Sequence, residues 1–143
     1  MSDPYRLQRF IEAQETIFDT ALAELKAGSK QSHWMWFIFP QLAGLGRSPI
    51  AQYFAIASIG EARAYLAHPV LGSRLRECIA TLLAWANRRS AVQILGSVDA
   101  LKLQSSLTLF EQVEPSGLFS LGLAAFYEGR LDESTLALLN ARA

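Results

Sequence analysis

Three polar side chains interrupt the apolar surface of a predicted helix that runs from Val98 to Glu111. Asp99, Lys102 and Ser106 have the spacing i, i+3 and i+7, which places them on one strip of an α-helix. Burial of an isolated ammonium group has a desolvation penalty on the order of several kcal/mol, so Lys102 needs a partner or a polar cavity. Two interpretations follow. Lys102 forms an intrahelical ion pair with Asp99, or it binds an anion in a pocket where Ser105 and Ser106 supply hydrogen bonds.

The other positions of this helix predict its orientation. The apolar residues fall on two arcs, and we expect both arcs to be buried. The arcs contain Val98, Leu101 and Leu109, and Leu103, Leu107 and Phe110. The solvent face is then left to Ala100, Gln104, Thr108 and Glu111.

A second candidate is the glycine-rich segment in front of Pro49, which contains Gly44, Gly46, Arg47 and Ser48. Glycine lets the backbone approach a ligand, and free N–H groups at a helix start favour anions. Arg47 could add a bidentate contact to a phosphate. The segment lacks the GxxxxGK and GxGxxG patterns of phosphate-binding loops, however. Taken alone, it is therefore more typical of a glycine turn before a helix capped by Ser48.

The third candidate is the stretch SHWMWFIFPQ, which concentrates large apolar residues between Ser32 and Gln41. A segment that is apolar on every side is typical of a core plug. The indole N–H groups of Trp34 and Trp36 need partners when buried, and His33 and Gln41 add polar groups at either end. The stretch could therefore also form a wall of a ligand site, with stacking rings.

The composition excludes several functional classes. The 143 residues carry 13 Lys+Arg and 13 Asp+Glu, so no overall charge favours nucleic acid. Two histidines and one cysteine do not make a disulfide framework or a Cys/His zinc site, and we expect no metal and no cofactor. The N-terminus lacks a signal-peptide layout and no apolar run approaches about 20 residues. We expect a cytoplasmic protein with no membrane partner.

Helical periodicity and capping residues predict an all-α fold without a sheet. We expect residues 1–143 to form one domain, a compact bundle of about six to eight helices. Gln14 falls in the middle of the apolar stripe of the first helix. A buried amide must be hydrogen-bonded, so Gln14 either braces a neighbouring segment or faces a cavity. The expected helices span 4–27, 49–57, 59–67, 69–86, 98–111, 118–128 and 133–140.

Several of these segments together resemble a known family. They are Asp3-Pro4, SHWMWFIFPQL, the GLG sequence with Ser48, and the residues of the helix from Asp99 to Phe110. In this combination the chain resembles the bacterial domain-of-unknown-function family 1810, some members of which carry the label "calpastatin". The resemblance implies a compact all-helical domain and no particular activity. The label has no support here, because nothing in the chain resembles the long disordered repeats of a calpain inhibitor.

Two hypotheses of function remain open. In the first, the protein is a small-molecule pocket protein, with or without catalysis, whose ligand bears a phosphate or resembles a nucleotide. Trp34 or Trp36 would stack on the ligand, and Arg47 and Lys102 would hold its anionic group. His33 or Asp99 would act as acid or base, and we count His33, Asp99 and Lys102 as the candidate catalytic residues. In the alternative, the protein is a non-catalytic interaction module with an unknown protein partner.

Overall fold

The chain folds into helices throughout the part that the computed structural model describes, residues 2–142. These residues form ten α-helices and no strand, which confirms the all-α prediction but exceeds the predicted six to eight helices. No helix within this range is long and apolar enough to cross a membrane. The helices are α1 (Gln8–Glu15), α2 (Phe18–Ala27), α3 (Met35–Ile38), α4 (Pro49–Tyr53), α5 (Ile59–Ala67), α6 (Leu71–Leu83), α7 (Ala91–Leu95), α8 (Ser97–Val113), α9 (Leu118–Tyr127) and α10 (Glu133–Ala141).

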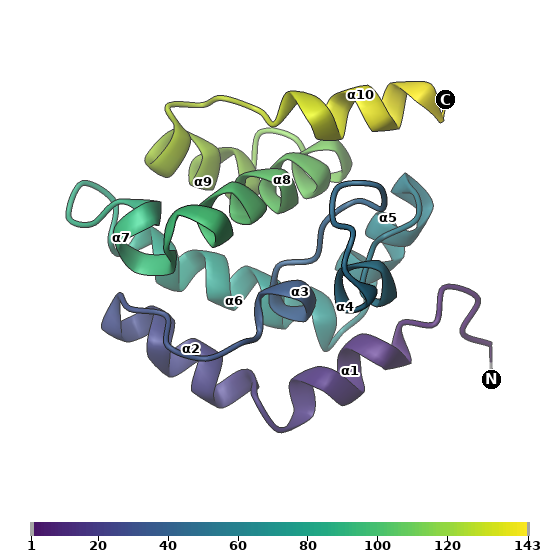
Figure 1. Cartoon of the computed structure of the whole chain (residues 1–143), viewed down its shortest axis with the longest axis horizontal. Helices are drawn as coiled ribbons and strands as arrows, with labels where there is room; N and C mark the ends of the chain where they lie inside the picture. The colour runs from purple at the N-terminus through teal and green to yellow at the C-terminus, as the bar shows by residue number, and fades with distance from the viewer. Residues whose placement is uncertain (1, 143) are drawn as a thin grey trace.

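Helix α8 is the centre of the arrangement (Figure 1). It contacts α5, α7, α9 and α10, and α6 contacts α2, α5 and α9. The core between these helices is rich in aromatic side chains. Phe110 of α8 stacks against Phe119 of α9 with 5.6 Å between ring centroids, and its other neighbour is Tyr65 of α5 at 5.5 Å. Four helices contact α8, and eight of its 17 residues are buried.

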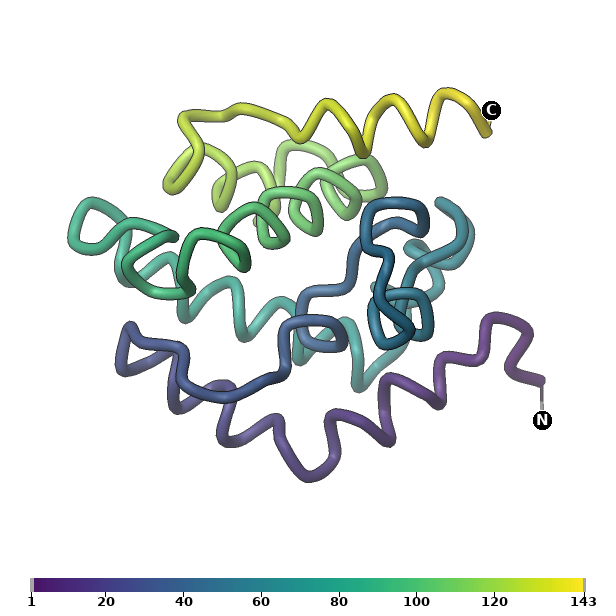
Figure 2. The backbone as a smooth tube through the Cα atoms, viewed as in Figure 1, coloured from purple at the N-terminus to yellow at the C-terminus, as the bar shows by residue number. Residues whose placement is uncertain are grey.

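The predicted first helix is two helices. The chain bends between α1 and α2 (Figure 2), where the backbone N–H of Ile17 turns back to the carbonyl of Gln14. The bend falls at Thr16 and Ile17, two β-branched residues with a lower helix propensity. The periodicity did not show the bend because the helices on both sides of it turn their apolar faces to the same core.

Two helices were missed because they are too short to show a period. Helix α3 has four residues and α7 has five. Helix α7 nevertheless carries a local signal, since Ser90 and Gln93 form a reciprocal capping box at its start. The sequence Ser58-Ile-Gly-Glu61 also fits a capping box, but only half of the box forms. The Ser58 hydroxyl accepts from the Glu61 N–H, but the Glu61 carboxylate accepts from the N–H of Ala57 instead.

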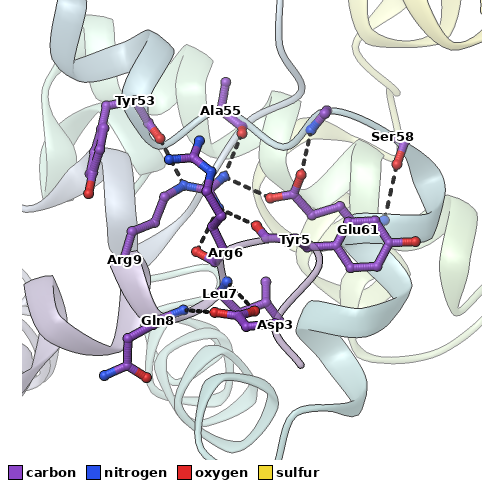
Figure 3. A network of polar contacts seen from close by, with 11 residues as sticks. Asp3, Tyr5, Arg6, Leu7, Gln8, Arg9, Tyr53, Ala55, Ser58 and Glu61 are labelled. Atoms are coloured by element: carbon purple, nitrogen blue, oxygen red, sulfur yellow. Dashed lines mark hydrogen bonds and ion pairs between the residues drawn. The ribbon is translucent and has the colours of Figure 1, made fainter. Parts of the chain in front are cut away.

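A buried ion pair joins the N-terminal helix to the middle of the chain (Figure 3). Arg9 Nη2 lies 2.7 Å from Glu61 Oε2, and both side chains are about 95% buried, with 5% and 4% exposed. The same guanidinium donates to the carbonyls of Tyr53 at 2.8 Å and Ala55 at 2.9 Å. The segment that follows α4 is thereby held against α1 by side-chain hydrogen bonds.

The predicted orientation of α8 is only partly right, since Leu103, Leu107, Leu109 and Phe110 are buried as expected but other positions are not. Val98 and Leu101 are each 66% exposed, whereas Ala100 and Thr108 are buried, at 4% and 0%. Helices α9 and α10 pack on the face that was expected to meet solvent. The Tyr127 hydroxyl donates to the Ala100 carbonyl, and the Thr108 hydroxyl donates to a carbonyl one turn earlier in α8. A wheel counts only side-chain polarity, and it cannot anticipate small and hydroxyl residues that admit a neighbouring helix closely.

Candidate functional site

A groove of about 260 Å³ lies where the loop after the aromatic stretch meets the first half of α8 and the start of α10. Its lining joins residues from all three segments that the sequence singled out to the start of α10, which the sequence did not single out. The lining residues are Gln41, Leu45, Gly46, Val98, Leu101, Lys102, Ser105, Asp132 and Ser134. Four of the predicted ligand-contacting or catalytic residues therefore share one cavity, namely Gln41, Gly46, Lys102 and Ser105.

The loop wall of the groove is held by backbone pairing rather than by a helix. Leu42 and Ile56 form an isolated parallel bridge, in which the Ile56 N–H donates to the carbonyl of Gln41 at 2.8 Å. From the other side, Arg142 Nη2 donates to the carbonyl of Ala43 at 2.6 Å. These contacts fix the loop between Gln41 and Gly46 against both the middle and the end of the chain.

The α10 wall is held by Asp132, which caps the helix as predicted. Its Oδ2 accepts from the Thr135 N–H at 3.0 Å and from the Thr135 hydroxyl at 2.6 Å. Ser105 of α8 lies 3.2 Å from the same oxygen. The Asp132 N–H also donates to the Thr108 hydroxyl at 2.8 Å. Asp132 is therefore locked to α8 at two points, and its carboxylate has a fixed position in the groove lining.

Lys102 belongs to a charged cluster that reaches beyond its own helix. Its Nζ lies 3.7 Å from Asp99 Oδ1, which realises the predicted intrahelical pair, and 5.2 Å from the centroid of the Trp36 ring. The other oxygen of Asp99 is closer to Lys30, at 3.0 Å. Lys30 in turn lies over the Trp34 ring at 4.9 Å. The two tryptophans of the aromatic stretch are thus each paired with one lysine of the cluster.

Trp34 is a core residue. It is fully buried, and its indole N–H donates to Glu24 at 2.9 Å, so no face of the ring is open to a ligand. Partial burial acts to raise the pKa of Glu24, but hydrogen bonds from Ser32, from the N–H of Gln31 and from Trp34 outweigh it and lower the pKa to about 2. The core-plug interpretation thus describes Trp34, whereas Trp36 is only partly buried.

Gln14 attaches the aromatic stretch to the core. Its side-chain amide donates to the carbonyl of Phe37 at 2.7 Å and to the Tyr65 hydroxyl at 3.1 Å, and Gln14 is only 1% exposed. Of the two roles predicted for this amide, the structure shows the bracing role.

Eight of the twelve predicted site residues lie outside the groove lining, and four of these eight are exposed: His33, Gly44, Arg47 and Ser48. The Ser48 hydroxyl is already used, since it accepts from the Ala51 N–H at 3.2 Å and so caps α4. Gly44 faces Leu138 of α10 rather than the groove. The glycine segment is therefore a turn and a helix cap, and of its residues only Leu45 and Gly46 line the groove.

Ser106 and Asp99 flank the groove without lining it. Ser106 is 1% exposed and points into the helix packing. Within residues 2–142 no cluster of three or more histidine, cysteine or carboxylate side chains is arranged to hold a metal ion.

The sequence reasoning missed Asp132 and Ser134 as lining residues, and it treated Val98 and Leu101 as core. Asp132 carried a visible signal, the capping position before the last helix, but this signal indicates a helix start and not a cavity. The lining now combines an ammonium group, a carboxylate, hydroxyl groups and an amide with three large apolar side chains, Leu45, Val98 and Leu101. Such a surface can bind a small polar molecule with an apolar part.

Comparisons with known proteins agree with the fold. The chain is similar to the crystal structure of the conserved hypothetical protein Rv1873 from Mycobacterium tuberculosis, with 46% sequence identity and a TM-score of 0.93. The similarity covers 96% of this chain and 99% of that one. No curated protein matches the sequence significantly. The profile of the family described as "Protein of unknown function (DUF1810)" matches residues 4–139, and the chain belongs to this family.

Proposed function

We propose that the groove binds a small molecule through an anionic group placed near Lys102. The observation that carries this proposal is the shared lining, in which Gln41, Gly46, Lys102 and Ser105 from distant parts of the chain meet in one cavity. Lys102 keeps 27% of its side chain exposed, so its ammonium group is accessible to a ligand. Gln41 supplies an amide donor in the same lining, whereas the Ser105 hydroxyl is already directed at Asp132.

The size of the groove limits the ligand. Ligand pockets usually measure roughly 300–1,000 Å³, and this groove is smaller, at about 260 Å³. Trp34 has no free face on which a base could stack. A small phosphate or carboxylate compound therefore fits better than a whole nucleotide, which could place only its phosphate end here.

The groove supports binding more directly than it supports a reaction. Of the three residues predicted as catalytic, only Lys102 lines the groove, while His33 lies outside it and Asp99 is engaged with two lysines. We therefore assign Lys102 an electrostatic role and no proton-transfer step.

A thermal-shift experiment tests the proposal with inorganic phosphate, glycerol 3-phosphate and short carboxylates as probes. A ligand at about 100 times its Kd adds about 2.7 kcal/mol to stability, which corresponds to a few degrees for a domain of this size. The shift should disappear in Lys102→Met and persist in Arg63→Met, which removes the same charge from an exposed position on α5. A probe that stabilises Lys102→Met as strongly as the wild type would place the site elsewhere.

A second candidate function, protein interaction, is favoured by the two apolar residues on the rim of the groove. Val98 and Leu101 are one turn apart on α8 and each is 66% exposed. Residues of this kind in close proximity are typical of a contact surface. If they join two copies of the chain, light scattering should show a dimer that Leu101→Lys dissociates. A protein that stays monomeric at all concentrations would exclude a dimer formed through these two residues.

A further inference from the structure

We propose that the natural ligand of the groove is a small zwitterion, with its anionic group at Lys102 and an ammonium group at Asp132. This inference rests on the proposed function, because it names the class of molecule that the same groove would bind. It follows from the balance of charge along the lining, where Lys102, Ser105 and Asp132 are consecutive neighbours.

The Lys102 end of the groove has an excess of positive charge. Asp99 is the carboxylate between two ammonium groups, Lys30 at 3.0 Å and Lys102 at 3.7 Å. Two ammonium groups and one carboxylate leave one positive charge. Asp99 is nearer to Lys30, and the Lys30 side chain is the more buried, with 9% exposed against 27% for Lys102. The excess charge is therefore available at Lys102, on the side that lines the groove.

The Asp132 end has an excess of negative charge. Within residues 2–142 Asp132 forms no ion pair, and its hydrogen bonds from Thr135 and Ser105 all go to Oδ2. The hydroxyls and the N–H that it accepts from carry no net charge, so the carboxylate keeps its formal negative charge, which the dipole at the N-terminus of α10 offsets only in part. The second oxygen, Oδ1, has no hydrogen-bond donor from the described part of the chain.

These two ends do not neutralise each other, because no ion pair joins Lys102 to Asp132. A simple anion at Lys102 would be attracted to the ammonium group but repelled by the carboxylate of Asp132. A ligand that carries an ammonium group as well turns this repulsion into a second attraction. Charge-assisted hydrogen bonds are stronger than neutral ones, so the second contact should add substantially to affinity.

The remaining lining suits the body of such a molecule. Leu45, Val98 and Leu101 offer apolar contact, and the volume of about 260 Å³ admits a compound of the size of an amino acid or a phosphorylated amine. The anionic group could be a carboxylate or a phosphate, since both pair with an ammonium group in the same way. Titration with matched probes distinguishes a carboxylate ligand from a phosphate ligand.

The test compares two matched pairs of probes by titration calorimetry on the full-length protein. O-phosphoethanolamine is compared with 2-hydroxyethyl phosphate, and leucine with 4-methylpentanoate. Within each pair the anionic group is the same and only one member carries the ammonium group. We expect the zwitterion of one pair to bind about 10- to 100-fold more tightly than its partner, as befits one hydrogen bond to a charged group. The pair that shows the preference identifies the phosphate or the carboxylate as the anionic group.

The variant Asp132→Asn provides a second, independent readout. Asparagine caps helices about as well as aspartate, so the start of α10 should be kept while the charge is removed. We expect the preference for the zwitterion to fall by the same 10- to 100-fold, with binding of the matched anion unchanged or improved. The control variant Arg63→Met should change neither the preference for the zwitterion nor the binding of the matched anion.

The outcomes separate the two proposals. Equal binding of both members of a pair would overturn the zwitterion and leave anion binding in place. A preference for the zwitterion that survives in Asp132→Asn would also overturn it, since the ammonium group would then be recognised elsewhere. No binding by any of the four probes would overturn both proposals. The comparison of probes needs only the wild-type protein, so it stands even if Asp132→Asn does not fold.

Discussion

Asp99 is bound more closely by Lys30, at 3.0 Å, than by its own helical neighbour Lys102, at 3.7 Å. Lys30 precedes the aromatic stretch and its backbone N–H donates to the carbonyl of Ile94 in α7 at 2.8 Å. The ion pair that looked local in the sequence is therefore part of a tertiary contact. Of the two lysines beside Asp99, Lys102 is therefore the one whose charge is less closely paired.

We predict that Lys102→Met is tolerated and that Asp99→Asn is not. Removal of Lys102 leaves Asp99 paired with Lys30, so the free energy of unfolding should change by less than about 1 kcal/mol. Removal of the Asp99 charge leaves Lys30, with 9% of its side chain exposed, without a carboxylate, and should cost about 1–3 kcal/mol. Urea denaturation of both variants measures the difference. A larger loss in Lys102→Met would show that Lys102 is the essential partner.

The Glu24 carboxylate should make stability depend on acid pH. Its pKa is about 2 in the folded protein against an ordinary value of 4.5, so its contribution is fully present above about pH 4.5 and is lost as the pH falls toward 2. After allowance for solvent screening of this partly exposed group, the contribution is about 1–2 kcal/mol. Glu24→Gln should therefore be less stable than the wild type at pH 7.

Denaturation at pH 7, 5 and 3 tests this expectation. The free-energy difference between wild type and Glu24→Gln should shrink between pH 5 and pH 3, because only the wild type carries the carboxylate. A difference that stays constant over this range would mean that the hydrogen bonds from Ser32 and Trp34, and not the charge, account for the effect.

Gly28→Ala should destabilise the protein more than Gly129→Ala. Both glycines have positive φ, 70° and 77°, so alanine is strained by about 1–2 kcal/mol at each. A Cβ at residue 28 would also lie 2.8 Å from the ring of Trp85, whereas residue 129 has no atom within 4 Å. We expect the collision to add about 1–3 kcal/mol, measured as the difference between the two variants. Equal losses would show that Trp85 moves aside without cost.

Arg9→Met should be among the most damaging single changes. It leaves the Glu61 carboxylate buried without its cation and removes the donors for the carbonyls of Tyr53 and Ala55. Loss of one partner of a buried pair costs about 3–5 kcal/mol. The double variant Arg9→Met/Glu61→Gln should recover part of this loss, because no charge then remains buried. Thermal unfolding measures the stability of both variants. A double variant that is less stable than Arg9→Met would show that the unpaired Glu61 charge is not the cause of the loss.

The elements of the fold were visible in the sequence where a helix has several turns and a cap. The start of α5 at Ser58, of α10 at Asp132 and the end of α2 at Gly28 agree with their capping residues. Helices α3 and α7 were not visible, since four or five residues show no period. The identity of α8 was clear, but its orientation was not.

The residues of the candidate groove were predicted in part, because Lys102, Ser105, Gln41 and Gly46 each break a local pattern. Polarity within an apolar face and glycine in a turn are properties of a short segment, and the sequence alone therefore determines them. The place of Lys30 beside Asp99, the complete burial of Trp34 and the arrival of Asp132 at Ser105 depend on contacts between segments far apart in the chain. Only the tertiary packing decided them, because the energy of such a contact belongs to the pair of surfaces and not to either segment of the sequence.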